Sequence, residues 1–184
     1  MTAQTLDRTL SSFRIGDPAG IYPIFDATGS TIAPGRWNTP GSPIIYTSEH
    51  YSTALLEKLV HGSGRLPPNQ HYIEITISRG LSYEVFSHPS LPGWDTVPAM
   101  VSQGFGETWC LERRSAILLV PSVVARLDCN VLINPAHPEF SKIHTSLHQP
   151  VYWTGGCLAR NGGKEGLSVA ISVCLPKSNS YRRC

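Results

Sequence analysis

Apolar residues recur at every second position from His71 to Ile77, where isoleucines alternate with polar or amphipathic side chains. A period of two predicts a half-buried β-strand in this segment. Short runs of branched apolar residues, each followed by a turn signal, predict further strands. These strands are expected at 13–15, 43–47, 116–120 and 130–133, with a last strand or strand edge at 140–143.

Apolar residues between Ala54 and Val60 are spaced as on one face of an α-helix. We expect this helix to begin after Ser48, whose hydroxyl suits the N-cap position, and to end near residues 61–62. Glu57 then lies about two and a half turns from the start of the helix. That position is close to the boundary between the apolar and polar faces, so spacing alone does not decide which way the carboxylate points.

A second helix is predicted over residues 96–110, with an interruption near Gly104 and Gly106 because glycine disfavours helix interiors. Residues 16–34 are rich in glycine, proline and aspartate, a composition that is typical of a loop. Together these elements predict a mixed α+β domain of roughly five or six short strands and two or three helices.

The predicted elements divide the chain into three stretches. Residues 1–12 are expected to form a short arm or a frayed helix, and residues 13–153 hold the domain. Residues 154–184 form a tail of different character, which begins with pairs of glycines. Within this tail, residues 167–174 are a candidate for one more strand.

The composition is that of a folded soluble protein, with 41% hydrophobic and 15% charged residues in a chain of 184. A net charge of +2 gives no strong general attraction to nucleic acids or anionic membranes. No apolar run approaches the ~20 residues that cross a bilayer, and the polar N-terminus lacks the apolar core of a secretion signal. We therefore expect one cytoplasmic domain that binds neither nucleic acid directly nor membranes.

The cysteines and histidines predict no metal site. No two cysteines have Cys-x-x-Cys spacing, and no predicted helix carries a His-x-x-x-His pair. The Gly-x-Gly at 62–64 lacks the third glycine and the preceding strand of a dinucleotide fingerprint. A dinucleotide would therefore be bound here without a Rossmann fold.

The stretch from Gly35 to Glu57 combines several chemical groups in a short space. It supplies a cation (Arg36) from a loop, a phenol (Tyr46) from a strand and a carboxylate from a helix. A guanidinium holds phosphate through two parallel hydrogen bonds. A carboxylate accepts hydrogen bonds from sugar hydroxyls and offsets developing positive charge. The stretch thus indicates a site for an anionic ligand in which charge develops on a sugar.

Several motifs in the chain resemble the RES domain, a family named for its arginine, glutamate and serine. They are Phe-Arg-Ile at 13–15, Gly-Arg-Trp-Asn at 35–38, Ile-Tyr-Thr-Ser at 45–48, Ala-Leu-Leu-Glu at 54–57, Leu-Val-Pro-Ser at 119–122 and Asn-Val-Leu-Ile-Asn-Pro-Ala-His-Pro at 130–138. The resemblance covers residues 13–153 in the family's order and spacing. It implies a fold like that of ADP-ribosyltransferases and an enzyme that cleaves the nicotinamide–ribose bond of NAD+, with inorganic phosphate as acceptor in some members.

The resemblance also implies the toxin of a type II toxin–antitoxin pair, whose usual partner is an Xre-like antitoxin with a helix-turn-helix part. Members of the family commonly end soon after the stretch that matches residues 151–153, with an acidic residue and an Arg-Leu pair. This chain continues instead with Thr154 and a glycine pair, so the tail departs from the family pattern. The oligomeric state and the identity of the antitoxin stay open.

By its motifs, the resemblance implies that Arg36 binds the NAD+ phosphates or an incoming phosphate, and that Glu57 orients the ribose. The alternative for both is an ordinary surface ion pair. Tyr46 would stack on nicotinamide or hydrogen-bond the ribose, unless it is a common sheet aromatic. Ser122 would contact phosphate or ribose, unless it is a turn residue. It is not expected to be a nucleophile, because no Ser-His-acid arrangement is evident.

Four further residues are expected at ligand-binding positions. Arg14 is a candidate second phosphate ligand, and Trp37 and Asn38 are expected to shape the loop that carries the arginine. Ser48, at the helix N-terminus, would help to hold an anion. The residues interpreted as turn residues rather than catalysts are Asn134 and His137.

Three functions stay open at this stage. The first is a toxin enzyme that degrades NAD+, as a glycohydrolase or a phosphorylase. The second is a protein ADP-ribosyltransferase on the same fold, which shares the cleavage step and differs in its acceptor. The third is an inactive, NAD-binding module whose tail has altered the site.

Overall fold

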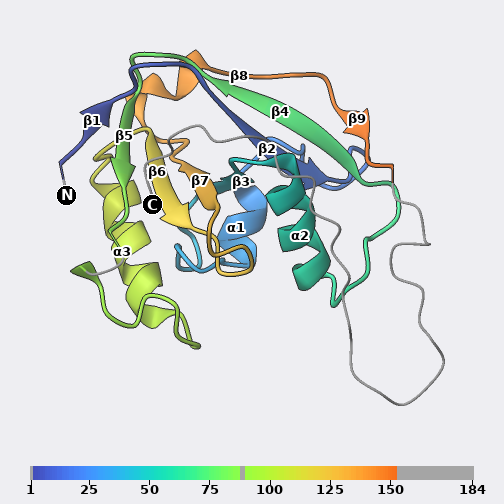
Figure 1. Ribbon diagram of the computed structural model, residues 1–184, viewed down its shortest axis with the longest axis horizontal. Coiled ribbons are helices and arrows are strands. Elements are labelled where there is room, and N and C mark those ends of the chain that lie inside the picture. The colour runs from blue at the N-terminus through green and yellow to red at the C-terminus, as the bar shows by residue number, and fades with distance from the viewer. Residues whose placement is uncertain (1, 88–89, 153–184) are drawn as a thin grey trace. The chain divides into compact units, whose positions relative to one another are not determined.

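The structure is a computed structural model that describes residues 2–87 and 90–152. The predicted tail, residues 154–184, and the candidate strand at 167–174 lie outside the described residues. Within the described part, the chain forms a mixed α+β domain built on a nine-stranded sheet (Figure 1). This agrees with the fold class that the sequence predicts.

The sheet has the strand order β1-β5-β6-β7-β3-β2-β4-β8, and β9 also pairs with β4. Only the contact between β5 and β6 is parallel, and the other pairs are antiparallel. The strands are β1 (Gln4–Thr5), β2 (Leu10–Gly16), β3 (Ile45–Ser48), β4 (His71–Ile77), β5 (Ser82–Val85), β6 (Ile117–Pro121), β7 (Cys129–Ile133), β8 (Ile143–Thr145) and β9 (Gln149–Pro150).

The sheet is joined at its middle by a narrow contact. β2 pairs with β4 along its whole length, and β3 pairs with β7 along its whole length. Between β2 and β3, by contrast, a single pair is in register, Phe13 with Ser48. Because Ser48 is the last residue of β3, the rest of β3 is not in register with β2, which leaves the carbonyl oxygen of Tyr46 available to a side chain from β2.

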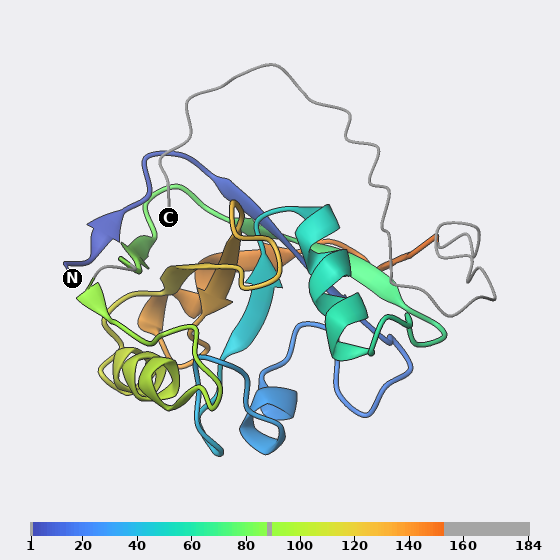
Figure 2. The ribbon, with the colours of Figure 1, turned by 60° about the horizontal axis from the view of Figure 1, so that its bottom comes forward.

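Three α-helices and a 3-10 helix complete the described fold. They are α1 (Thr28–Ile32), α2 (Tyr51–His61), α3 (Met100–Leu111) and η2 (Pro138–Lys142). In both ribbon views α3 and α2 lie toward opposite ends of the sheet, with α1 between them (Figures 1 and 2). α2 follows β3 directly and packs on β2 and β3, so it stands next to the narrow joint in the sheet.

Several local predictions are wrong in detail. Ser48 is the last residue of β3, and His50 is the N-cap of α2, without a side-chain cap bond. α3 runs uninterrupted through Gly104 and Gly106. Residues 138–142 form a 3-10 helix before the short strand β8, and the stretch expected as an arm contains β1 and the start of β2.

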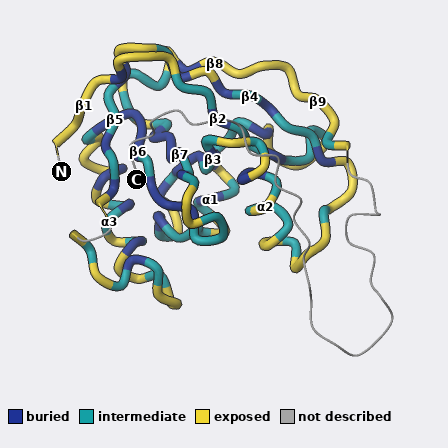
Figure 3. Tube along the Cα trace, in the orientation of Figure 1, coloured by how far each residue is buried: buried dark blue, intermediate teal, exposed yellow. Residues whose placement is uncertain are grey.

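Two apolar clusters cover opposite faces of the sheet. One contains Ile45 with isoleucines of β4, and the other contains Leu132 with Trp109 of α3. Tyr46 packs against the second cluster, so neighbouring residues of β3 face opposite sides, as the strand period requires. Burial is deepest on the central strands, and the edge strands β1 and β9 are exposed (Figure 3).

The apolar face predicted for α2 is only partly buried. Leu56 is 37% exposed and Val60 is 52% exposed, whereas Thr53 and Ala54 are buried. Because the buried stripe is displaced around the helix, Glu57 lies on the side that faces the sheet rather than the side that faces solvent. This displacement brings the carboxylate within reach of β3, β6 and β7.

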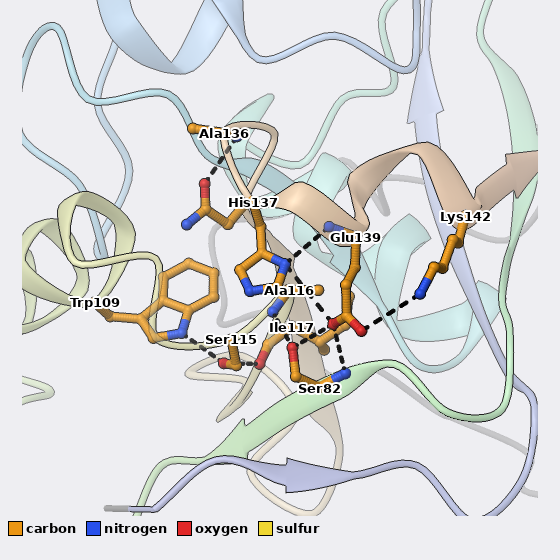
Figure 4. A network of polar contacts seen from close by, with 10 residues as sticks. Ser82, Trp109, Ser115, Ala116, Ile117, Ala136, His137, Glu139 and Lys142 are labelled. Atoms are coloured by element: carbon orange, nitrogen blue, oxygen red, sulfur yellow. Dashed lines mark hydrogen bonds and ion pairs between the residues drawn. The ribbon is translucent and has the colours of Figure 1, made fainter.

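A polar network ties η2 to β5 and β6 (Figure 4). Ser82 donates its hydroxyl proton to Glu139, and its oxygen accepts the backbone N–H of Ala116. The His137 ring accepts the backbone N–H of Glu139, which caps the 3-10 helix. The hydrogen bonds of Ser82 therefore connect η2 to the sheet. His137 caps the 3-10 helix, which agrees with its interpretation as a turn residue.

Candidate functional site

Four side chains from four segments are joined by hydrogen bonds, and we call them the Glu57 cluster: Ser48, Glu57, Ser122 and Asn130. Glu57 Oε1 accepts two hydrogen bonds, from Ser122 Oγ at 2.9 Å and from Asn130 Nδ2 at 2.7 Å. Ser48 Oγ donates to Asn130 Oδ1 at 2.7 Å. The cluster therefore connects α2 to β3, to β7 and to the end of β6.

Ser122 is fully buried and is fixed from both sides. Its hydroxyl donates to Glu57, and its oxygen accepts the backbone N–H of Ala125 at 3.0 Å. In the sequence, Ser122 is recognised as a candidate because it follows a buried strand and a proline. Glu57 and Ser122 lie 65 positions apart in the chain, so the fold brings two residues that are distant in the sequence into direct contact.

The second oxygen of Glu57 has a different environment. Its Oε2 lies 3.9 Å from Nε2 of His61, one turn further along α2, and the imidazole is 80% exposed. The Glu57 side chain keeps 22% of its surface exposed. One carboxylate oxygen is thus held by the protein, and the other faces a side chain that is open to solvent.

The loop that carries Arg36, residues 35–38, is fixed mainly by Asn38 and Tyr46, and we call it the Arg36 loop. Tyr46 donates its phenol proton to Asn38 Oδ1 at 2.7 Å and accepts the Trp37 N–H at 3.0 Å. Asn38 Oδ1 also accepts the Gly35 N–H at 2.8 Å. Its amide group donates to the backbone carbonyls of Ser30 and Ser42 at 2.7 and 2.9 Å.

Two glycines make room for the Arg36 loop. A β-carbon on Gly35 would lie 2.7 Å from the phenol oxygen of Tyr46. A β-carbon on Gly106 of α3 would lie 1.9 Å from the carbonyl oxygen of Trp37. The indole of Trp37 packs edge-to-face on Phe86 and Phe105, so Trp37 and Asn38 both serve the shape of the loop.

The phenol hydroxyl of Tyr46 uses its proton and one lone pair in hydrogen bonds to the Arg36 loop. Burial raises the pKa of Tyr46 well above its ordinary value, with a smaller opposing effect from the hydrogen bond to the Trp37 backbone. The hydroxyl therefore stays protonated at physiological pH and points into the Arg36 loop. A contact of Tyr46 with nicotinamide or ribose stays a prediction.

Arg36 is half-buried, and its Nη1 donates to two backbone carbonyls, Trp94 O at 3.2 Å and Thr96 O at 2.9 Å. Among residues 2–87 and 90–152, Arg36 and Glu57 share no hydrogen-bond partner. The structure thus connects Ser48, Ser122 and Glu57 by hydrogen bonds, through Asn130, and places Arg36 on a separate loop that is bonded to residues 94–96. A joint action of the two motif residues on one ligand is still a prediction.

Arg14 lies at the narrow joint between the half-sheets. Its Nη1 donates to the carbonyl oxygen of Tyr46 at 3.5 Å. Burial lowers the pKa of Arg14 to about 10, and the nearby carboxylate of Asp26 partly opposes that effect. The pKa of Lys58 on α2 is also lowered, first by burial and then by repulsion from Arg14. Two neighbouring cations that are both partly desolvated form a favourable environment for an anion.

The structure contains a separate cavity of about 350 Å³ beneath α1, on the other face of the sheet from Tyr46. Its lining includes Phe25, Thr31, Ile45 and Phe140 and none of the candidate site residues. Within the described ranges, no group of three or more potential ligands is arranged to hold a metal ion. None of the helices in those ranges has the length and apolar character needed to span a bilayer.

Asn130 is the residue of the Glu57 cluster that sequence reasoning missed. It stands at the start of the Asn-Val-Leu-Ile-Asn-Pro stretch and was interpreted only as part of a strand. The missing signal was strand register, because Asn130 pairs directly with Ser48 across β7 and β3. Side chains of directly opposed residues lie on the same face, so this pairing places the amide beside the serine.

Comparison with known proteins gives consistent likenesses. A model of the RES domain matches residues 12–154. The chain is 43% identical to the "Prs ADP-ribosylating toxin" of Sphingobium sp. strain YBL2, over 71% of this chain and 86% of that protein. It is 31% identical to a protein named Toxin Res of Photorhabdus laumondii, over 64% of this chain and 77% of that protein.

Among solved structures, the chain resembles one in the crystal structure of the Mycobacterium tuberculosis MbcT–MbcA toxin–antitoxin complex. The TM-score is 0.61, and the match covers 80% of this chain and 86% of that chain. Sequence identity is 14%, so this likeness concerns the fold alone. It confirms the mixed sheet with few helices as a known architecture.

Proposed function

The chain belongs to the RES domain family, and from that premise we propose that it is a toxin enzyme that breaks the nicotinamide–ribose bond of NAD+. The observation that carries the proposal is the Glu57 cluster. The match to the family motifs would say little about a site if the residues pointed apart, but Glu57 and Ser122 are in direct contact. Their contact leaves a second carboxylate oxygen available to a ligand.

The role proposed for the carboxylate follows from the charges that develop when the nicotinamide–ribose bond of NAD+ breaks. Nicotinamide leaves as a neutral base, and the ribose carbon that it leaves acquires oxocarbenium character. A carboxylate near the ribose stabilises this positive charge and accepts hydrogen bonds from the ribose hydroxyls. In this proposal Glu57 Oε2 has that role, while Ser122 and Asn130 hold Oε1.

The pyrophosphate of NAD+ requires cations, and the proposal assigns it to Arg14 and Arg36. Arg14 stands at the joint between β2 and β3, next to Lys58. Arg36 uses Nη1 for the loop at residues 94–96, and a guanidinium has further N–H donors for a phosphate oxygen. No metal ion is needed in this scheme, because the cations of the protein balance the phosphate charge.

Three acceptors for the ADP-ribosyl group are compatible with this proposal: water, inorganic phosphate and a protein. Water or inorganic phosphate would make the protein an NAD+ glycohydrolase or phosphorylase. A protein acceptor would make it an ADP-ribosyltransferase, and the name of the Sphingobium relative favours this second candidate. Both reactions share the bond that breaks, and so they share the proposed role of Glu57.

We expect the toxin to act on cytoplasmic NAD+ and to be neutralised by an antitoxin. The structural likeness to a chain in a toxin–antitoxin complex supports such a partner. The family resemblance suggests an Xre-like antitoxin with a helix-turn-helix part, and a small gene beside this one that encodes such a protein would agree with it.

The proposal is tested by expressing the chain without an antitoxin and measuring cellular NAD+. We expect NAD+ to fall and growth to stop, and Glu57→Ala or Arg36→Ala to prevent both effects. Incubation of the purified protein with radiolabelled NAD+ then identifies the acceptor: ADP-ribose indicates water, its phosphorylated form indicates phosphate, and label on a macromolecule indicates transfer to protein. Stable NAD+ with normal growth and no nicotinamide release would contradict the proposal.

A further inference from the structure

We propose that Asn130 is a positioning residue for Glu57: its amide holds one carboxylate oxygen so that the other faces the ribose. This inference rests on the proposed function, because it assigns a direction to the carboxylate in NAD+ cleavage. It is carried by three hydrogen bonds, Ser48 to Asn130, Asn130 to Glu57 and Ser122 to Glu57.

The orientation of the Asn130 amide is fixed by the chemistry of its neighbours. Glu57 offers only acceptor oxygens when ionised, so the NH₂ group must face it. The opposite orientation would place two oxygens at about the 2.7 Å that separates Nδ2 from Oε1. Ser48, whose hydroxyl can donate, accordingly faces Oδ1. The serine therefore sets the direction of the amide, and the amide sets the direction of the carboxylate.

The two donors on Glu57 converge on the same atom. Ser122 Oγ and Asn130 Nδ2 both reach Oε1, which uses both of its lone pairs. Rotation of the carboxylate about its last bond would exchange the two oxygens and is opposed by both donors at once. Oε2 is therefore presented in one direction, toward the exposed side of α2 where His61 lies.

A second asparagine, which directly follows the last residue of β7, shows that the arrangement at Asn130 near the start of the strand is particular. Asn134 is fully buried, and its amide donates to the backbone carbonyl of Cys110 while its Oδ1 accepts the Ala136 N–H. These contacts close a turn and attach it to α3. Asn130, in contrast, is half-buried, and within the described part of the chain its side chain bonds the side chains of Ser48 and Glu57. Asn134 is thus a matched control for the same substitution.

The test is Asn130→Asp. This substitution keeps the size of the side chain and the acceptor for Ser48, but it replaces the NH₂ group that donates to Glu57 with a carboxylate oxygen. Two carboxylates at this separation repel each other, which raises the pKa at which the pair loses its last proton, so they share one proton only at low pH. At pH 8 we expect kcat for nicotinamide release to fall about 30- to 100-fold, with the KM for NAD+ changed less than about threefold. As the pH is lowered toward 5, the shared proton restores a donor, so the loss should shrink.

Asn134→Asp, measured below its melting temperature, should lower stability but keep kcat within about threefold and show no such recovery at low pH. Ser48→Ala, which leaves the amide unanchored, should lower kcat about fivefold and serves if Asn130→Asp does not fold. Turnover of Asn130→Asp that stays within about threefold of wild type at pH 8 overturns the inference. A loss without recovery at low pH, or an equal loss in Asn134→Asp, overturns it as well.

A wild-type protein that releases no nicotinamide counts against the proposed function rather than against this inference. The position of Glu57 is then compared in crystal structures of the wild type and of Asn130→Asp. A carboxylate that swings away from Ser122 in the variant supports the positioning role, and an unmoved carboxylate overturns it.

Discussion

The Arg36 loop and the Glu57 cluster differ in where their hydrogen bonds go. In the Arg36 loop, Asn38 and Arg36 donate to backbone carbonyls, and Tyr46 accepts a backbone N–H. In the Glu57 cluster three hydrogen bonds join side chains to one another, although Ser122 also accepts the backbone N–H of Ala125, and the second carboxylate oxygen accepts none of these bonds. The hydrogen bonds of the Arg36 loop fix the conformation of its backbone. Those of the Glu57 cluster fix the orientation of the Glu57 carboxylate.

This difference explains why neighbouring motifs have unlike roles. Gly35 and Asn38 have structural roles: Gly35 leaves room for the Tyr46 ring, and Asn38 accepts the Gly35 N–H within the loop. Glu57 has no such explanation, because a carboxylate held at one oxygen contributes little to the fold of α2. Apart from those at Arg36 itself, substitutions in the loop should therefore act mainly on stability, and substitutions in the cluster should act mainly on turnover.

The largest effect is expected for Glu57→Gln, which keeps the acceptor for Ser122 and Asn130 and removes the charge. We expect nicotinamide release to fall about 1,000-fold, because the oxocarbenium charge loses its counter-charge. The free energy of unfolding in urea should change by less than about 1 kcal/mol. Glu112→Gln, on an exposed residue at the end of α3, removes the same charge and should leave turnover unchanged.

Gly106→Ala tests the loop side of the comparison. The added methyl group would meet the Trp37 carbonyl oxygen at 1.9 Å, so we expect a loss of about 3 kcal/mol or more in the free energy of unfolding. Gly104→Ala, in the same helix with no atom within 4 Å of the new β-carbon, should instead stabilise by up to about 1 kcal/mol. Equal effects of the two substitutions would show that α3 does not pack on the Arg36 loop as described.

Arg36→Lys tests whether Arg36 only stabilises the loop or also binds the phosphates of NAD+. Lysine keeps the charge but loses the planar fork that suits phosphate. We expect the KM for NAD+ to rise about tenfold and the free energy of unfolding to fall by about 1 kcal/mol, through the weakened bonds to the carbonyls of Trp94 and Thr96. If stability falls and KM is unchanged, Arg36 supports the loop without binding the substrate.

Tyr46→Phe should have the smallest effect, a loss of about 1–2 kcal/mol in the free energy of unfolding, because Asn38 and the Trp37 N–H lose their shared partner. Burial raises the pKa of Tyr46 in the folded state, so above pH ~10 only the unfolded chain releases this proton. The wild type therefore loses stability as the pH rises past that value, and its advantage over the variant should shrink. An advantage that stays constant from pH 8 to 11 would contradict the buried phenol.

The sequence predicted strands well where their pattern is regular, as at β4, whose bounds match the alternation from His71 to Ile77. It was wrong about Ser48, because an N-cap and a strand end offer the same hydroxyl, and only the pairing of β3 with β7 decides between them. It was also wrong about an interruption in α3. Helix propensity disfavours Gly106, but the close approach of Trp37 requires it.

The candidate site shows the same limit. The motifs named Glu57 and Ser122, and the structure brings them into contact. Asn130 could not be found from its own neighbours in the chain, because its importance comes from the register between β3 and β7 and from the turn of α2 that faces them. The joint action of Arg36 with Glu57 depends on a ligand between them, which neither spacing nor strand pairing describes.

The most direct test of the account is a crystal structure of the wild-type chain with an NAD+ analogue whose nicotinamide ribose carries a methylene in place of its ring oxygen, so that the bond resists cleavage. We expect a ribose hydroxyl within hydrogen-bonding distance of Glu57 Oε2, with Ser122 and Asn130 still bonded to Oε1 and the pyrophosphate against Arg14 or Arg36. An analogue bound elsewhere, or a Glu57 carboxylate turned away from the ribose, would contradict it.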